Sequence, residues 1–139
     1  MANKSFEKCI NSILAGIESR KSVDYGDKKS VRKYNAAYGR MKNNAMYINT
    51  HYSYRIDELF GLTNHSDPEI AYAVACLIIY HIDCSNTMKR ATIGVVKKLY
   101  DEGKTPKLSE LTLPSCIMNW EKIYPETAKD TSNVTGDPL

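Results

Sequence analysis

The stretch "HSDPEIAYAVACLIIYH", residues 65–81, decides the fold class because a helix-start signal runs directly into an unbroken apolar segment. Asp67 is favoured at a helix N-cap, Pro68 fits the first turn, and Glu69 suits the positive end of the helix dipole. The segment 70–80 contains several alanines, which favour a helix over a strand. Because it is apolar on every side, it predicts a central helix that is buried on most sides.

The same apolar segment is too short to be a membrane anchor. It counts eleven residues, and polar side chains flank it closely, namely Asp67, Glu69, His81 and Asp83. A membrane-spanning helix needs about 20 apolar residues. The sequence therefore predicts a helix in the core of a soluble protein and no membrane partner.

Amphipathic periodicity surrounds this central helix. Apolar residues recur at three- and four-residue steps in the neighbouring segments, which is typical of helices with one buried face. The predicted helices span residues 5–20, 27–49, 54–60, 86–102 and 114–124. Gly61 and Gly103 are expected to end two of them, since glycine is common just past a helix C-terminus. Residues 125–139 have little to bury and predict a flexible tail.

Together these segments predict an all-α fold. No segment alternates apolar and polar residues convincingly over the length of a strand, and short turns between helices favour antiparallel neighbours. The helix pair over residues 68–102 has about the size of one HEAT-like unit. We therefore expect stacked antiparallel helical hairpins, a HEAT-like α/α superhelix, in one domain over residues 1–124.

The composition is that of an ordinary globular domain. The 139 residues are 42% apolar and 25% charged, and the net charge is +3, which is far below that of a dedicated nucleic-acid binder. The charge is uneven, since residues 1–60 carry eleven basic and six acidic side chains, whereas residues 61–139 carry eight and ten. Nucleic acid is therefore not the expected partner.

The N-terminus and the cysteines bear on the location of the protein. Residues 1–21 lack the apolar core and cleavage site of a secretory signal, so we expect the mature chain to start near Met1. Scattered cysteines within helical patterns are typical of reduced thiols in the cytosol. They are Cys9, Cys76, Cys84 and Cys116. The expected location is the cytoplasm.

No pattern in the sequence requires an enzyme. The histidines His51, His65 and His81 lack a neighbouring arrangement of nucleophile and base. The best metal candidate, Cys76, His81 and Cys84, does not place all three side chains on one helix face and has no evident fourth ligand. Buried thiols and a helix-end histidine explain the same residues. We expect a non-enzymatic protein without a metal or another cofactor.

One candidate binding surface is basic. Lys29, Lys33 and Arg40 share a face of the predicted helix 27–49, together with Asn44 and Tyr47. Such a face could hold phosphates or an acidic protein. Basic side chains are normally exposed, so a solvated helix face is the alternative interpretation.

The other candidate surface is aromatic and acidic. The stretch "MYINTHYSYRIDEL", residues 46–59, brings tyrosines close to carboxylates, and tyrosine is enriched at protein interfaces. Packing of these tyrosines against the core is the alternative. Two acidic residues lie at the C-terminal end of helix 86–102, where the helix dipole makes negative charge unfavourable. Such an unfavourable placement can mark a surface that binds a partner. The candidate anchors are Tyr47, Tyr52, Tyr54, Asp57, Glu58, Asp101 and Glu102.

Two longer stretches carry a family resemblance. The stretches "SVRKYNAAYGRM" (30–41) and "LTNHSDPEIAYAVACLII" (62–79), followed by a second helix and a short closing helix, resemble small bacterial HEAT-like proteins. Several of these are immunity proteins of toxin systems, including contact-dependent growth inhibition. The similarity covers roughly residues 27–124. Its markers are Arg32, Asn35, Met41, the segment 59–62, His65, Asp67, Pro68, Glu69, Ala73 and Ala75.

The resemblance implies a protein that binds the C-terminal domain of a cognate toxin and blocks its active site or substrate access. Such occlusion needs a preorganised surface with aromatic or charged anchors. The mildly basic charge implies a toxin that is not strongly basic, or one that faces the acidic C-terminal half. The alternatives are a HEAT-like nucleic-acid-binding module that uses Lys29, Lys33 and Arg40, or an adaptor for an endogenous protein.

Overall fold

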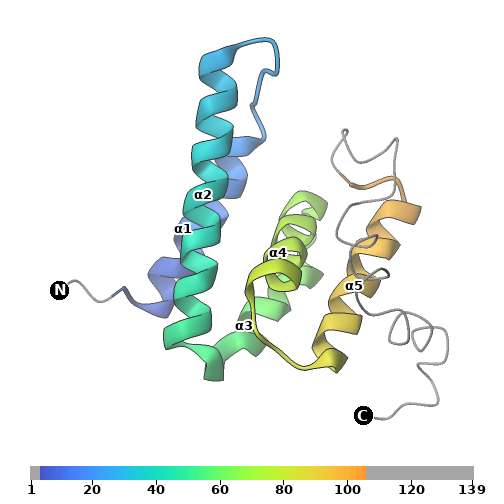
Figure 1. Ribbon diagram of the computed structural model, residues 1–139. Coiled ribbons are helices and arrows are strands. Elements are labelled where there is room, and N and C mark those ends of the chain that lie inside the picture. Colours follow the sequence, from blue (N-terminus) through green and yellow to red (C-terminus); the bar gives the residue numbers. More distant parts are fainter. Residues whose placement is uncertain (1–3, 106–139) are drawn as a thin grey trace.

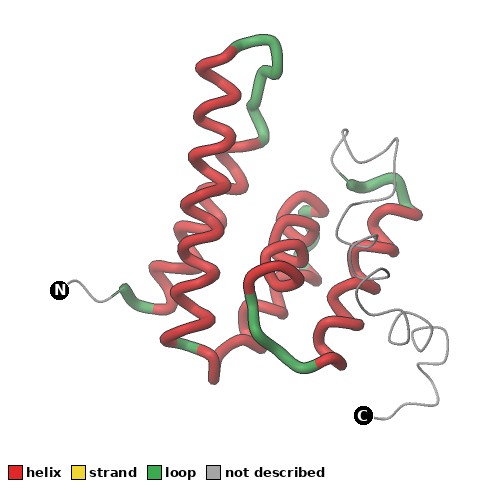
Figure 2. The backbone as a smooth tube through the Cα atoms, viewed as in Figure 1, coloured by secondary structure: helices red, strands yellow, loops and turns green. Residues whose placement is uncertain are grey.

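The structure, a computed structural model, describes residues 4–105, and these form helices joined by short turns (Figures 1 and 2). Helix α3 lies between two 3-10 turns, η1 and η2. The elements are α1 (Phe6–Arg20), α2 (Lys28–His51), η1 (Ser53–Arg55), α3 (Ile56–Gly61), η2 (Leu62–Asn64), α4 (Pro68–His81) and α5 (Asn86–Asp101). The segment 4–105 contains no strand, so the all-α fold class is confirmed. The predicted closing helix 114–124 and the tail 125–139 lie outside the described residues.

The helices form two antiparallel hairpins. Helix α1 packs along α2, and α4 packs along α5, while α3 crosses between the hairpins near their lower end in Figure 1. Helix α4 also contacts α1, α2 and α3, so it has the central position that its apolar sequence predicts. Helix α2 has 24 residues, which gives it a length of about 36 Å. The tip of the α1–α2 hairpin therefore extends beyond α4 and α5 (Figure 1).

The start of α4 is fixed by the residues that predict it. The Asp67 carboxylate accepts a hydrogen bond from the Glu69 backbone N–H at 2.9 Å, and His65 Nδ1 accepts one from the Asp67 backbone N–H at 2.9 Å. The Lys21 ammonium group also donates to the Asp67 carboxylate. This hydrogen bond is the main reason that the pKa of Asp67 lies below its ordinary value. The helix-start signal thus also ties the first hairpin to α4.

The core lies where α1, α2, α3 and α4 meet. The residues of α1 that the sequence places on its apolar face are buried or half-buried, as predicted. Helix α4 has six buried residues, which lie on most of its sides. The main buried cluster comprises Phe6, Cys9, Ile13, Ile17, Met41, Ala45, Ile48, Ile56, Leu59, Ile70, Val74, Leu77, Ile78 and Ile82.

The other end of α4 is closed by a lysine from α5. The Lys89 ammonium group donates hydrogen bonds to the carbonyl oxygens of Ile78, Ile79 and Ile82 at 2.9, 2.7 and 2.7 Å. The last carbonyls of a helix lack partners within the helix, and a cation there suits the helix dipole. Burial lowers the pKa of Lys89. Lys89 therefore joins the two helices of the second hairpin.

The short helix α3 ends at Gly61, as predicted, but without the left-handed conformation that glycine often adopts at a helix end. Gly61 has a φ of −55° and continues the chain from α3 into η2. The predicted stop at Gly103 is confirmed, because this residue has a φ of +69° directly after α5. A glycine marks a helix end where such a positive φ is needed.

Candidate binding surface

Three tyrosines predicted as anchors lie together where α2 meets η1. The ring centroids of Tyr47 and Tyr52 are 6.2 Å apart, and those of Tyr52 and Tyr54 are also 6.2 Å apart. Tyr54 is 77% exposed, whereas Tyr47 and Tyr52 are half-buried and pack against the core. Packing against the core is therefore found for Tyr47 and Tyr52, whereas the role of the exposed Tyr54 at an interface stays a prediction. We call Tyr47, Tyr52 and Tyr54 the tyrosine corner.

The segment before α1 holds the tyrosine corner in place. The Tyr52 hydroxyl donates a hydrogen bond to the Lys4 carbonyl at 2.7 Å, and the Lys4 backbone N–H donates to the Tyr47 hydroxyl at 3.2 Å. The Phe6 ring meets the Tyr52 ring edge-on at 5.8 Å. Contacts of this kind restrict the rotamers of two tyrosines before any partner arrives, which lowers the entropic cost of binding.

Arg55 adds charged groups beside the tyrosine corner. Its guanidinium group binds both carboxylate oxygens of Glu58, at 2.7 and 2.9 Å, and the Glu7 carboxylate at 2.9 Å. It also lies over the Phe6 ring, 4.0 Å from the centroid. The hydrogen bonds with Glu58 and Glu7 raise the pKa of Arg55, and that with Arg55 lowers the pKa of Glu58. Asp57 lies exposed on the same short helix.

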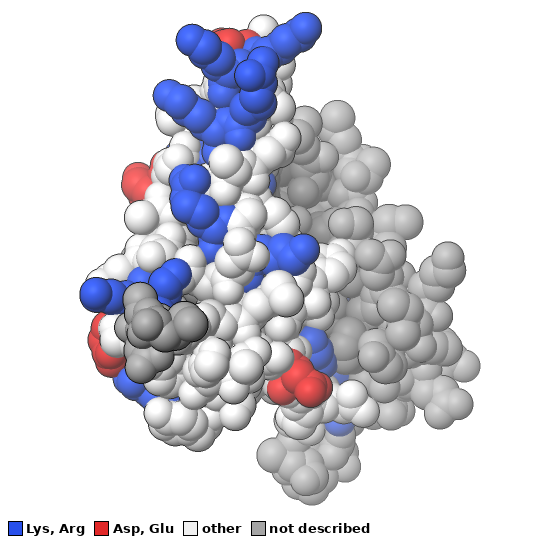
Figure 3. All heavy atoms as spheres, turned by 60° about the vertical axis from the view of Figure 1, so that its left-hand side comes forward, with Lys and Arg blue, Asp and Glu red and all other residues white. Residues whose placement is uncertain are grey.

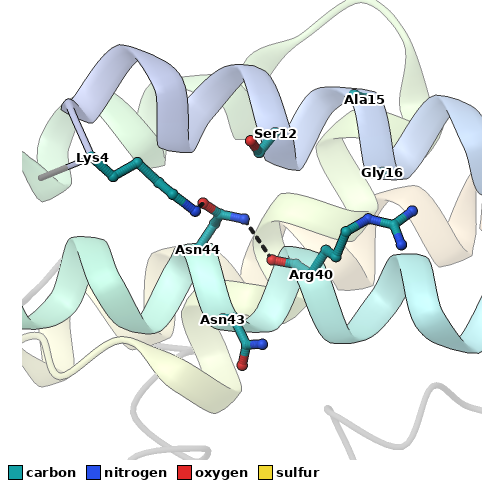
Figure 4. Close-up of a pocket in the computed structure, with 7 residues that line it drawn as sticks. All are labelled: Lys4, Ser12, Ala15, Gly16, Arg40, Asn43 and Asn44. Atoms are coloured by element: carbon teal, nitrogen blue, oxygen red, sulfur yellow. Dashed lines mark hydrogen bonds between the residues drawn. The ribbon is translucent and has the colours of Figure 1, made fainter. Parts of the chain in front are cut away.

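A groove lies between α1 and α2 (Figure 4), and it shares Lys4 with the tyrosine corner. Its volume is about 320 Å³. The Lys4 ammonium group donates to Asn44 Oδ1 at 2.9 Å, and Asn44 Nδ2 donates to the Arg40 carbonyl at 2.7 Å. Asn44 is 4% exposed, so its predicted place on an exposed face is wrong, since α1 covers it. The groove is lined by Lys4, Ser12, Ala15, Gly16, Arg40, Asn43 and Asn44.

The predicted basic face lies on the same hairpin. Lys29, Lys33 and Arg40 are exposed, and their spacing puts them on one side of α2. Lys28 and Arg32 are exposed in the same first turns of α2, although the sequence analysis did not single them out as binding residues. Figure 3 shows lysine and arginine atoms gathered at the tip of the hairpin and continuing down it. The structure thus confirms an exposed basic face.

Lys4 connects the two candidate surfaces into one. Its backbone binds two members of the tyrosine corner, and its ammonium group binds Asn44 in the groove that Arg40 lines. We call this continuous surface, from Glu58 through the tyrosine corner and groove to Lys29, the binding face. Sequence reasoning missed Lys4 because it lies 43 positions from Tyr47 and 40 from Asn44, and no local pattern signals contacts of that separation.

Two predicted anchors lie elsewhere. Asp101 and Glu102 are exposed at the C-terminal end of α5. In Figure 1 this is the upper end of α5, whereas α3 and the end of α2 lie near the bottom of the molecule. The Glu102 carboxylate pairs with the Lys104 ammonium group at 3.3 Å. The structure therefore does not bring these two carboxylates together with the other anchors.

The candidate metal ligands do not converge. Within the described segment, no three His, Cys, Asp or Glu side chains are arranged to hold a metal ion. His81 Nε2 lies 3.0 Å from the Tyr38 hydroxyl, and burial is the main cause of its lowered pKa. Within the described segment Cys9, Cys76 and Cys84 form no disulfide; Cys76 and Cys84 are half-buried and Cys9 is fully buried.

The search for membrane segments and for relatives adds two findings. In residues 4–105, no helix has the length and apolar character needed to cross a membrane. Comparisons of the chain with models of protein families, with curated proteins and with solved structures found no significant match.

Proposed function

We propose that this protein acts by binding another protein through the binding face. The observation that carries the proposal is the tyrosine corner, in which an exposed tyrosine stands beside two that are held by hydrogen bonds to Lys4. Anchors of this kind contribute most of the affinity at protein interfaces when they are aromatic and already ordered. Bidentate pairs such as Arg55 with Glu58 add charged groups of fixed geometry.

More specifically, we propose that it is an immunity protein that neutralises a cognate bacterial toxin domain by occlusion. The family resemblance of residues 27–124 supports this, together with the expected HEAT-like stacking of its hairpins and a cytoplasmic location. In contact-dependent growth inhibition such a protein would protect the producing cell. The mechanism needs no catalytic group, because a bound protein blocks access to the toxin's active site by its volume alone.

The test begins with co-expression. The C-terminal domain encoded by the neighbouring toxin gene is expressed with and without the full chain, while growth and co-purification are followed. Growth arrest that is rescued by a stable stoichiometric complex is the expected result. A neighbouring domain that is harmless, or that does not bind the chain, would contradict the proposal.

The interface is then mapped with two matched double variants. Tyr54→Ala with Asp57→Ala removes exposed groups of the binding face, and Asp101→Ala with Glu102→Ala removes exposed groups at the far end of the molecule. We expect the first pair to weaken toxin binding by about 100-fold, as for hot-spot residues, and the second to leave it nearly unchanged. The reverse result would move the interface to the end of α5. Tyr52 is avoided because its hydroxyl and ring also support the fold.

The second candidate is a nucleic-acid-binding module, which the exposed basic side chains at the hairpin tip favour. It predicts binding to RNA or DNA whose affinity falls steeply as the salt concentration rises. A third candidate, an adaptor, would bind an endogenous protein through the same face without inhibiting it. Rescue from a toxin is the result that separates the immunity proposal from both.

A further inference from the structure

The groove between α1 and α2 has cationic groups at its two ends. Figure 4 shows the Lys4 ammonium group at one end, beside Asn44, and the Arg40 side chain extending toward Gly16 at the other. The Ser12 hydroxyl lies between them on the α1 side. Within residues 4–105 the exposed Arg40 guanidinium group makes no hydrogen bond or ion pair with another side chain. Its donors are therefore free to meet an anion.

The packing of the hairpin keeps the groove open and ordered. At Gly16 the two helices approach so closely that an added Cβ would lie 2.5 Å from Met41 Cγ. The wall of α1 here consists of small residues, Ala15 and Gly16, which leave room above α2. On the opposite wall the buried Asn44 amide fixes the Lys4 ammonium group through its oxygen and is itself fixed through its nitrogen. One cation is thus positioned before a ligand binds.

We infer that this groove receives a carboxylate side chain, from an Asp or Glu of the protein partner, between Lys4 and Arg40. The inference rests on the proposed function for the source of the carboxylate. Guanidinium groups bind carboxylates through two parallel hydrogen bonds, and the Ser12 hydroxyl is available as a further donor. A volume of about 320 Å³ lies at the lower end of ligand pockets, so the groove has ample room for an Asp or Glu side chain.

The charges around the groove favour a protein over a nucleic acid. A nucleic-acid backbone carries a negative charge at every phosphate. Beyond Lys4, the binding face presents the carboxylates of Glu7 and Glu58, which are held by Arg55 and exposed. These carboxylates would repel the next phosphates of a continuous strand. A protein surface of mixed charge can instead place an acidic side chain in the groove and basic or aromatic groups on the tyrosine corner.

The test uses the full chain labelled with nitrogen-15 and titrated with a hexaglutamate peptide. NMR signals of the Asn44 side-chain amide and of the Ser12 and Gly16 backbone amides report on the groove. We expect these signals to shift with hexaglutamate and to stay in place with hexaglutamine, the uncharged control. A 12-nucleotide oligothymidine is the comparison for nucleic acid.

Two double variants with equal loss of charge separate a site from general attraction. Lys4→Met with Arg40→Met empties the groove of cations, and it should weaken hexaglutamate binding by about tenfold, as expected for lost charge-assisted hydrogen bonds. Lys42→Met with Lys98→Met removes two exposed cations that lie outside the binding face and should change the affinity by less than about twofold. Arg40→Gln serves as a second groove variant if the thermal melt shows that the first double variant is unstable.

Five results would overturn either the carboxylate site or the immunity function. Equal weakening by the two double variants, or shifts spread along α2 without the groove signals, would overturn the site. Tighter binding of oligothymidine than of hexaglutamate at the groove would overturn it in favour of nucleic acid. Toxin rescue by a chain whose groove ignores hexaglutamate removes the site and keeps the proposed function. Groove binding without toxin rescue removes the immunity function and keeps the carboxylate site for a different protein partner.

Discussion

The two hairpins differ in how much of the surface of their helices is buried. Helix α2 is long and buries one side, with Ala37, Met41, Asn44, Ala45 and Ile48, so most of its length faces solvent. Helix α4 is shorter and is buried on most sides. The first hairpin therefore carries most of the binding face and also supplies half of the main buried cluster, whereas α4 contributes mainly to the core. The comparison teaches that a long amphipathic helix can serve the core and an exposed surface at once, while a short apolar helix serves the core.

The largest expected effect on stability comes from a charge placed inside the second hairpin. Val74→Asp puts an unpaired charge at a position with 0% exposure in α4, and we expect a loss of more than about 4 kcal/mol in the free energy of unfolding. Circular dichroism during thermal unfolding measures it. Ala36→Asp, at an exposed position of α2, is the matched control and should cost less than about 1 kcal/mol. A cooperative wild-type melt of Val74→Asp would contradict the buried position of α4.

A smaller effect is expected at the junction of α4 and α5. Lys89→Met removes a donor to three carbonyls, of which Ile78 keeps the hydrogen bond from the Ile82 N–H, and loss of partners for buried acceptors costs about 1–3 kcal/mol. Urea unfolding of this variant and of Lys98→Met, an exposed lysine on α5, measures the difference. Equal stability of the two variants would show that Lys89 does not stabilise the end of α4.

Alanine substitution of one glycine in each hairpin compares how closely the helices pack there. In Gly16→Ala the new Cβ crowds Met41, and such overpacking destabilises by about 1–3 kcal/mol. The better helix propensity of alanine offsets about 1 kcal/mol of this loss. Gly94→Ala in α5 has open space around the new Cβ and should stabilise by up to about 1 kcal/mol. Opposite signs are therefore expected in denaturant unfolding. If both changes stabilise the protein, α1 and α2 do not pack as closely as described.

The smallest effect is a pH dependence at the contact between the hairpins. Burial lowers the pKa of His81, with further lowering by Lys42 and Lys89, so the unfolded chain binds a proton at higher pH than the folded protein does. Neutral His81 therefore contributes its full stabilisation at pH values above the pKa of histidine in the unfolded chain, about 6.5. This contribution is lost as the pH falls through the lower pKa of His81 in the folded protein. His81→Phe should flatten the loss of stability between pH 7 and 5, measured by thermal unfolding. Parallel curves for the two proteins would contradict it.

Many residues of the binding face could be predicted from the sequence, but their arrangement in one surface could not. The three tyrosines and the basic residues Lys29, Lys33 and Arg40 could be named because residue type and helical spacing are visible in the sequence. That they form one surface could not be predicted, since it depends on Lys4, which contacts Tyr52 across 48 positions. Asp101 and Glu102 were grouped with the tyrosines by chemistry alone, and the course of α5 separates them.

What the sequence by itself determined is the set of helices over residues 4–105 and the burial of α4. The physical reason is that caps, proline, glycine at positive φ and apolar periodicity act within a few residues of one another. The tertiary structure decided which polar side chains meet. The burial of Asn44, the role of Lys4, the Lys89 contact with α4 and the groove all require chain segments far apart in sequence to pack, and such contacts leave no local pattern to read.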